Sequence, residues 1–267
     1  MSIQQGLDRL DTEHTHREFS MAYETNRFCW HGAITSDLDR AEGFYAETLG
    51  WQVQIAEMGD GEVRMFAAAG VPLAHLARPS AEGIGSHWES YLRVDDVDAS
   101  TAAAVQHGGQ VLVAPTDIAP GRLSVVTSPG GAPLSLFHEA DPTAEHHPGG
   151  DGSVRWVELH SKQIEADLAW LSATFGFGAN KVDVPRGAYF VLEHGGVPRG
   201  GALASRSEED PPMWLPWIQV SSADEALERA QQHGGRGVTP PMDVPGVGRV
   251  AIMADPTGGV LGVIAPT

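Results

Sequence analysis

FYAETLGW (Phe44–Trp51) and WLSATFGF (Trp170–Phe177) are two versions of one segment, and they lie 126 positions apart. Both place a glycine, Gly50 or Gly176, directly before an aromatic residue. A series of matches at one spacing indicates an internal repeat, so the chain contains two copies of one module. The same offset of 126 recurs in Trp30 and Trp156, in Gly70-Val71-Pro72 and Gly196-Val197-Pro198, and in His107-Gly108-Gly109 and His233-Gly234-Gly235.

Each copy contains patterns of both strands and helices. Alternating side chains predict a first strand over 28–36 and over 154–162, and helical spacing predicts helices that stop at Gly50 and Gly176. Shorter helices are expected to end at the two Gly-Gly pairs, over 96–107 and 222–233. The remaining strands are expected at 62–69, 73–78, 88–94, 122–127 and 133–138, with counterparts at 187–193, 200–205, 214–220, 248–253 and 259–264. The predicted organisation is an N-terminal tail (1–27), a first module (28–138), a linker (139–153) and a second module (154–267).

The composition excludes several classes of partner. The chain has 17 Lys and Arg against 35 Asp and Glu, a formal net charge of −18, so it would repel nucleic acids and anionic membrane surfaces. Cys29 is the single cysteine and cannot form an intramolecular disulfide, which favours a reducing, cytoplasmic location. No segment approaches the roughly 20 consecutive apolar residues that a membrane span requires. We therefore expect a small-molecule partner, with no nucleic acid and no membrane.

Three segments of each copy together resemble a known superfamily. In the first copy they are SDLDRAEGFYAETLGW (36–51), YLRVDDVDASTAAAVQHGG (91–109) and SPGGAPLSLF (128–137). In the second they are QIEADLAWLSATFGFG (163–178), WIQVSSADEALERAQQHGG (217–235) and DPTGGVLGVI (255–264). This pattern resembles the vicinal oxygen chelate superfamily, which includes glyoxalases, bleomycin-resistance proteins and extradiol dioxygenases.

The resemblance implies an α+β fold: two tandem βαβββ modules whose mixed sheets curve into paired cups. It is similar in particular to the tandem glyoxalase-like proteins of high-GC bacteria. The superfamily contains lyases, isomerases, dioxygenases, transferases and binding proteins, so the fold alone does not define the reaction.

The resemblance also implies where a divalent metal would bind in the metal-dependent members. The ligand positions on the first, middle and last strands correspond to Trp30, Glu89 and Ser135, and in the second copy to Trp156, Leu215 and Gly262. Of these, only Glu89 could bind a metal, whereas such a site needs about three ligands. We therefore predict no cofactor and no metal. If the strands were shifted by one residue, His31, His87 and Glu139 would instead form a set of two histidines and one carboxylate.

Glu158 and His160 are the candidate catalytic residues. Strand alternation places them on the face that carries Trp156, which is the inside of the predicted second cup. A confined carboxylate and imidazole in contact could act as a general acid and base. The alternative is a structural hydrogen-bonded pair or a simple salt bridge.

Tryptophans on the predicted cup strands are the candidate substrate-binding residues. Flat aromatic walls suit a planar, conjugated ligand, although each tryptophan could equally be part of the core. Glu89, at the middle position, would contact the same ligand. The tryptophans concerned are Trp30, Trp88, Trp156, Trp214 and Trp217.

These residues favour a metal-independent enzyme that isomerises, dehydrates or cyclises a planar ligand in natural-product metabolism. One alternative is a non-catalytic protein that binds and sequesters an antibiotic. Another is a metal-dependent dioxygenase or glyoxalase, which requires the shifted register. Either a monomer or a homodimer is compatible with two modules in one chain.

Overall fold

The computed structural model describes residues 25–58, 61–141, 149–184, 187–205, 207 and 209–267. Among these residues, no helix is long and apolar enough to span a bilayer. Most of the predicted tail and the central part of the predicted linker, 142–148, lie outside the described residues.

The first module contains two successive βαβββ motifs. The first motif is followed along the chain by a second of the same order. The elements are β1 (Phe28–Ile34), α2 (Leu38–Leu49), β2 (Gln52–Met58), β3 (Gly61–Ala68) and β4 (Val71–Ala77), then β5 (His87–Arg93), α3 (Val97–Gln106), β6 (Gln110–Ile118), β7 (Gly121–Thr127) and β8 (Pro133–Glu139).

The second module repeats this order element by element. Its elements are β9 (Val154–Ser161), α4 (Ile164–Phe175), β10 (Gly178–Val184), β11 (Gly187–His194) and β12 (Val197–Ala204), then β13 (Met213–Gln219), α5 (Ala223–Gln232), β14 (Arg236–Val244), β15 (Gly248–Ala254) and β16 (Val260–Pro266). The internal repeat and the α+β fold predicted from the sequence are both confirmed.

The described strands form two mixed eight-stranded sheets. Their orders are β2-β3-β4-β1-β5-β8-β7-β6 and β10-β11-β12-β9-β13-β16-β15-β14, identical once the strands are renumbered. β1 pairs with β4 in parallel, and β9 with β12, whereas β2, β3 and β4 form antiparallel pairs. The four strands β2, β6, β10 and β14, which the sequence pattern did not predict, form the sheet edges, where most side chains of β6, β10 and β14 are exposed.

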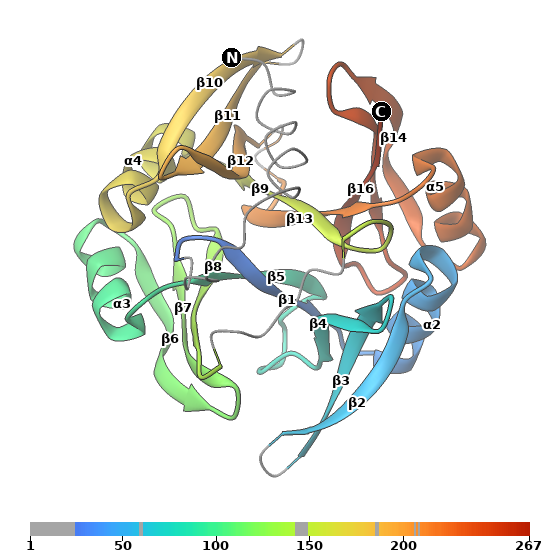
Figure 1. Ribbon diagram of the computed structural model, residues 1–267, viewed down its shortest axis with the longest axis horizontal. Coiled ribbons are helices and arrows are strands. Elements are labelled where there is room, and N and C mark those ends of the chain that lie inside the picture. Colours follow the sequence, from blue (N-terminus) through green and yellow to red (C-terminus); the bar gives the residue numbers. More distant parts are fainter. Residues whose placement is uncertain (1–24, 59–60, 142–148, 185–186, 206, 208) are drawn as a thin grey trace, which may run out of the picture. The chain divides into compact units, whose positions relative to one another are not determined.

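The chain divides into two compact units, and each unit combines parts of both modules. The described residues of the first unit lie within 25–29, 91–141 and 157–214, and those of the second within 30–90, 149–156 and 215–267. Figure 1 shows α3 beside α4, both from the first unit, and α2 beside α5, both from the second. We call the sheet face that contacts the helices the outer face and the opposite one the inner face.

Glycines end the helices as the sequence predicts. Gly50 and Gly176 follow α2 and α4 with φ of 71° at both, a left-handed conformation that glycine adopts without steric cost. In the second Gly-Gly pair, Gly234 has φ of 86°, and a Cβ on Gly235 would lie 2.6 Å from the Phe44 ring. Gly235 therefore allows α2 to approach the end of α5 closely.

Candidate functional site

Side-chain contacts define the two faces of β9. Ser161 Oγ donates a 2.6 Å hydrogen bond to Asp167 Oδ2 of α4, so Ser161 is on the outer face. Because successive side chains of a strand alternate between faces, Leu159 shares the outer face while Glu158 and His160 are on the inner one. The structure thus places both candidate catalytic residues on the face expected from the sequence.

Glu158 and His160 form a hydrogen-bonded pair. His160 Nε2 lies 2.8 Å from Glu158 Oε1, and the two side chains are 18% and 10% exposed. When Glu158 is an ionised carboxylate it only accepts hydrogen bonds, so the tautomer that fits this contact has its ring proton on Nε2 and its lone pair on Nδ1. Limited exposure to water strengthens this pairing.

The neighbouring strand β12 places a glycine beside Glu158. β12 pairs with β9 so that Gly201 is the partner of Glu158, and Leu203 is the partner of His160. A glycine at this position adds no side chain over the carboxylate. On the β12 side, His160 therefore neighbours a leucine and Glu158 neighbours a glycine.

Three of the five candidate tryptophans have clear packing contacts. Trp88 is on the outer face, where its Nε1–H donates to Tyr45 Oη at 3.0 Å and its ring contacts Trp51. Trp214, which is the repeat equivalent of Trp88, is 3% exposed and contacts the Phe28 ring. Trp217 is on the inner face and covers Gly262, whose Cβ would lie 2.3 Å from the indole. Trp88 and Trp214 are therefore part of the hydrophobic core. Neither is a candidate for ligand binding.

Trp30 and Trp156 are both half-buried. Trp30 is on the inner face of β1, where its Nε1–H donates to His75 Nδ1 at 3.1 Å. Glu89, on the inner face of β5, lies 3.6 Å from His87. Sequence reasoning missed His75. It could have been noticed from the repeat, because His75 corresponds to Gly201, the residue beside Glu158.

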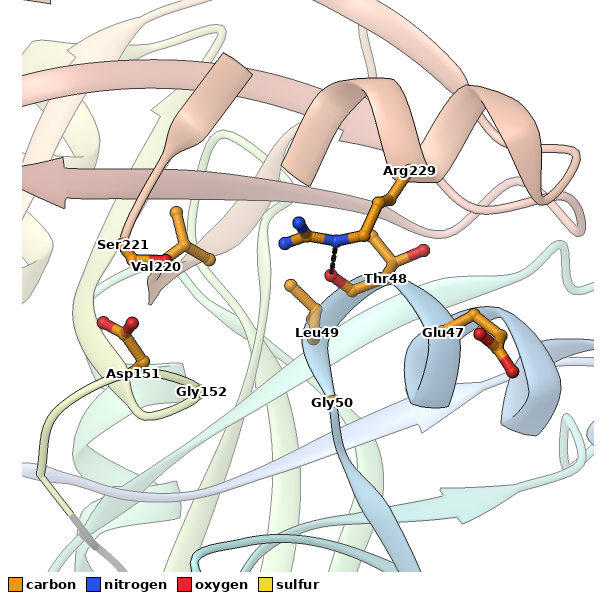
Figure 2. A pocket seen from close by; sticks show the side chains of 9 residues that line it. All are labelled: Glu47, Thr48, Leu49, Gly50, Asp151, Gly152, Val220, Ser221 and Arg229. Carbon is orange, nitrogen blue, oxygen red and sulfur yellow. Dashed lines mark hydrogen bonds between the residues drawn. The ribbon is translucent and has the colours of Figure 1, made fainter. Parts of the chain in front are cut away.

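A surface hollow lies where α2 ends. It encloses about 260 Å³ beside Gly50, and Arg229 Nε donates to the Thr48 carbonyl at its edge, as Figure 2 shows. A second hollow of about 210 Å³ occupies the repeat-equivalent place at the end of α4, where Asn26 Nδ2 donates to the Phe175 carbonyl. Because both hollows surround a side chain that satisfies a helix carbonyl, we assign them to helix termination.

The family described as "Glyoxalase/Bleomycin resistance protein/Dioxygenase superfamily" matches residues 27–136 and 153–262. The chain belongs to this superfamily. The two matched segments correspond to the two modules, each with its own eight-stranded sheet.

Curated relatives cover nearly the whole chain. A Mycobacterium tuberculosis protein named as a glyoxylase, CFP32, is 32% identical over 249 residues, which span 89% of this chain and 94% of the relative. The anthracycline biosynthesis protein DnrV of Streptomyces peucetius is 27% identical over 252 residues, 88% of this chain and 91% of DnrV.

Solved structures share the fold at low identity. The Mn(II)-bound glyoxalase of Novosphingobium aromaticivorans has a TM-score of 0.64 and 19% identity, covering 90% of this chain and 81% of that one. The 2,3-dioxygenase LapB of Pseudomonas sp. KL28 has a TM-score of 0.65 and 13% identity, covering 91% and 93%.

The residues at the superfamily's metal-ligand positions do not fit a metal ion. In the first module Trp30 donates its N–H to His75, and in the second the last position is Gly262, covered by Trp217. The described residues contain no group of three or more His, Cys, Asp or Glu side chains arranged to hold a metal.

The alternative metal set predicted from a shifted register is wrong. His31 is on the outer face, 3.3 Å from Ser90 Oγ, whereas His87 is on the inner face of β5 with Glu89. Glu139 forms a buried ion pair with Arg93. His31, His87 and Glu139 therefore each have a different partner and do not form one ligand set.

Proposed function

We propose that this protein is a metal-independent acid–base catalyst that moves protons on a planar, conjugated small molecule, with Glu158 and His160 as the catalytic pair. The observation that carries the proposal is the 2.8 Å contact between these two side chains, which are largely buried on an inner sheet face. The similarity to DnrV, a protein named for anthracycline biosynthesis, favours a polycyclic natural product as the ligand.

His160 acts as the base in this mechanism. Its Nδ1 takes a proton from a ligand carbon whose carbanion is conjugated with a ring carbonyl, and the imidazolium that forms is stabilised by the Glu158 carboxylate at Nε2. Return of the proton to another ligand atom gives an isomer. Return of the proton to a departing hydroxyl group gives water and a new double bond.

Hydrogen–deuterium exchange of anthrone tests the proposal. Anthrone carries two acidic C–H protons opposite a ring carbonyl, and their replacement in deuterium oxide reports proton removal. The wild-type protein should accelerate the exchange, and His160→Gln should reduce this acceleration by roughly 10²–10⁴-fold. His233→Gln, which changes an exposed histidine beyond α5, is the matched control and should leave the rate unchanged. Equal rates for the wild type and His160→Gln, with both proteins folded, would contradict the proposal.

An antibiotic-binding protein is the second candidate, favoured by the half-buried Trp30 on an inner face. Such a protein would bind polycyclic compounds tightly without catalysing exchange, and Glu158→Gln would not weaken binding. Tight binding together with an unaccelerated exchange rate would therefore favour this candidate.

Elemental analysis tests the metal-dependent alternative. Because the ligand positions hold Trp30 and Gly262, protein purified without chelator should contain well under one equivalent of manganese, iron, nickel or zinc. Treatment with a chelator should leave anthrone exchange unchanged. One equivalent of metal that is lost together with activity would refute metal independence.

A further inference from the structure

The inner face of the first module carries its own cluster of ionisable groups, at some distance along the chain from Glu158 and His160. His75 of β4 is paired with Gly32 of β1, and its ring occupies the space that a side chain on Gly32 would need. A Cβ on Gly32 would lie 2.4 Å from His75 Cε1. Glycine at position 32 is therefore what allows the imidazole to lie across β1.

His75 is held as a neutral imidazole. The Trp30 indole donates to His75 Nδ1, so the ring proton is on Nε2. Burial lowers the pKa of His75, and the nearby Glu89 carboxylate opposes this shift only in part. Trp30 contacts His75, and Glu89 lies on the same inner face of β5, the strand next to β1; all three residues belong to the second compact unit.

Glu89 and His87 form a second carboxylate–imidazole pair. His87 Nε2 lies 3.6 Å from Glu89 Oε1, and the two side chains are 35% and 27% exposed. The nearby Glu89 carboxylate raises the pKa of His87, and the Gly85 carbonyl, 2.8 Å from Nδ1, acts in the same direction. This pair is more accessible than Glu158 and His160.

Each module places an ionisable side chain at the same position of its sheet, but from a different strand. The side chain is His75 of β4 in the first module and Glu158 of β9 in the second. Gly32 corresponds to Glu158 and His75 to Gly201, each 126 positions apart, and the two pairs are partners in equivalent parallel strands. In the first module β1 has the glycine and β4 has the ionisable side chain. In the second module β9 has the ionisable side chain and β12 has the glycine. At this position each module therefore has one glycine and one ionisable side chain on the two paired strands.

We propose that the first module carries a second ligand-binding site formed by Trp30, His75 and Glu89, which takes a planar, hydroxylated aromatic compound. Glu89 accepts a hydrogen bond from a ring hydroxyl, and the Trp30 indole contacts the ring plane. His75 is a positioning residue that fixes the indole. The proposal does not depend on catalysis by Glu158 and His160.

Alizarin, a dihydroxyanthraquinone, is the probe for this site. Native mass spectrometry of the full chain with alizarin should show binding to the wild type that survives His160→Gln. Titration followed by alizarin absorbance should show about tenfold weaker binding at one site in Glu89→Gln, because a hydrogen bond to a charged acceptor is lost. Glu62→Gln, at an exposed position of β3, is the matched control and should leave the affinity unchanged.

A second variant, Gly32→Ala, tests the same site without changing the Glu89 carboxylate. Gly32→Ala should displace the His75 ring and weaken binding at the same site, provided that circular dichroism shows a folded protein. Unchanged affinity in Glu89→Gln would overturn the second site, as would failure of alizarin to bind the wild type. The anthrone exchange rate is measured in the same variants. Loss of alizarin binding in Glu89→Gln without any catalysed exchange in the wild type would refute the catalytic proposal and leave the second site supported.

Discussion

At the scale of single residues, Tyr45 links a buried carboxylate to a buried indole. It is fully buried, its hydroxyl donates to Asp255 Oδ2 at 2.7 Å, and it accepts a hydrogen bond from Trp88. Burial, and then the Asp255 carboxylate, raise the pKa of Tyr45 well above its usual value, so the phenol stays protonated. In the second module Leu171 replaces Tyr45, and Trp214 Nε1 has no partner within the described part of the chain.

Tyr45→Phe should destabilise the protein. The substitution leaves the Trp88 N–H and one oxygen of a buried carboxylate without a hydrogen bond, at a cost of about 2–3 kcal/mol. Urea unfolding of Tyr45→Phe, Asp255→Asn and the double variant measures the coupling between the two side chains. A loss below about 0.5 kcal/mol in Tyr45→Phe, typical of surface substitutions, would contradict this view of the network.

His75 should make the protein sensitive to acid. Because its folded-state pKa is lowered, the folded protein favours the neutral ring, and stability is lost as pH falls through the ordinary histidine range. Between about pH 7.5 and about pH 5.5, the free energy of unfolding should fall less in His75→Gln than in the wild type. His87 has a raised pKa and acts in the opposite direction, so His87→Gln should make the loss steeper. Parallel pH profiles for all three proteins would contradict both assignments.

The sequence predicts some residues of the candidate site and not others, for a physical reason. Alternation along one strand places Glu158 and His160 on the same face, because both belong to the same short segment. His75 acts beside Trp30, 45 positions away in the chain, and only the parallel pairing of β1 with β4 brings them together. The prediction that Trp88 lines a ligand wall is not supported, because alternation separates two faces without indicating which one contacts a helix.

At the scale of elements, the Gly-Gly pairs determine how closely a helix of one module approaches the helix of the other. Gly235 lies against Phe44 of α2, and its repeat equivalent Gly109 lies against Trp170 of α4, where a Cβ would be 3.0 Å from the indole nitrogen. Trp170 Nε1–H also donates to the Ala104 carbonyl of α3 at 3.0 Å. Similar contacts therefore join α2 to α5 and α4 to α3.

Gly235→Ala should destabilise the protein, and Gly43→Ala should stabilise it. At Gly235 the new methyl group would meet the Phe44 ring at 2.6 Å and the Ala254 carbonyl at 2.8 Å, and overpacking of this kind costs about 1–3 kcal/mol. Gly43 lies inside α2, where a Cβ would meet no neighbouring atom within 4 Å, so alanine there should add about 0.5–1 kcal/mol through helix propensity. Thermal unfolding of both variants measures the two effects. Equal melting temperatures would contradict the packing argument.

Edge strands explain most of the secondary structure that the sequence pattern did not predict. β6 and β14 each have a neighbour on only one side, and neither has a fully buried residue. Without a buried face, their side chains need not alternate between apolar and polar. β6 even exposes Val111, Leu112 and Val113. Central strands such as β1, β8 and β13 bury most of their side chains, and the sequence pattern predicts these strands.

At the scale of the whole molecule, the compact units do not coincide with the modules. The core of the second unit contains Trp51, Phe66 and Trp88 from the first module together with Ile218, Leu227 and Val263 from the second. Hydrophobic periodicity indicates that a side chain is buried, and it gives no information about which distant segment buries it. The repeat therefore predicts two modules. It does not predict that segments of the first module pack against segments of the second.

Specific hydrogen bonds join the two modules within each unit. In the second unit, Tyr45 of the first module donates to Asp255, whose other oxygen accepts from the backbone of the 255–259 turn. In the first unit, Asp167 of the second module accepts from the backbone of Gly130 at 2.7 Å. In both units, a helix of one module thus connects to the closing turn of the other.

Separation of the modules should therefore abolish independent folding. Residues 1–145 expressed alone would keep α2 and lose α5, so Phe44 and the surrounding apolar side chains would be exposed to water. We expect each half to aggregate when expressed alone, and residues 1–145 and 146–267 to purify together as a one-to-one complex when coexpressed. Asp167→Ala and Tyr45→Phe in the split protein should weaken this complex, because the intact linker no longer keeps the two halves at high local concentration. Two halves that fold separately as monomers with cooperative unfolding transitions would show instead that each module contains a complete core.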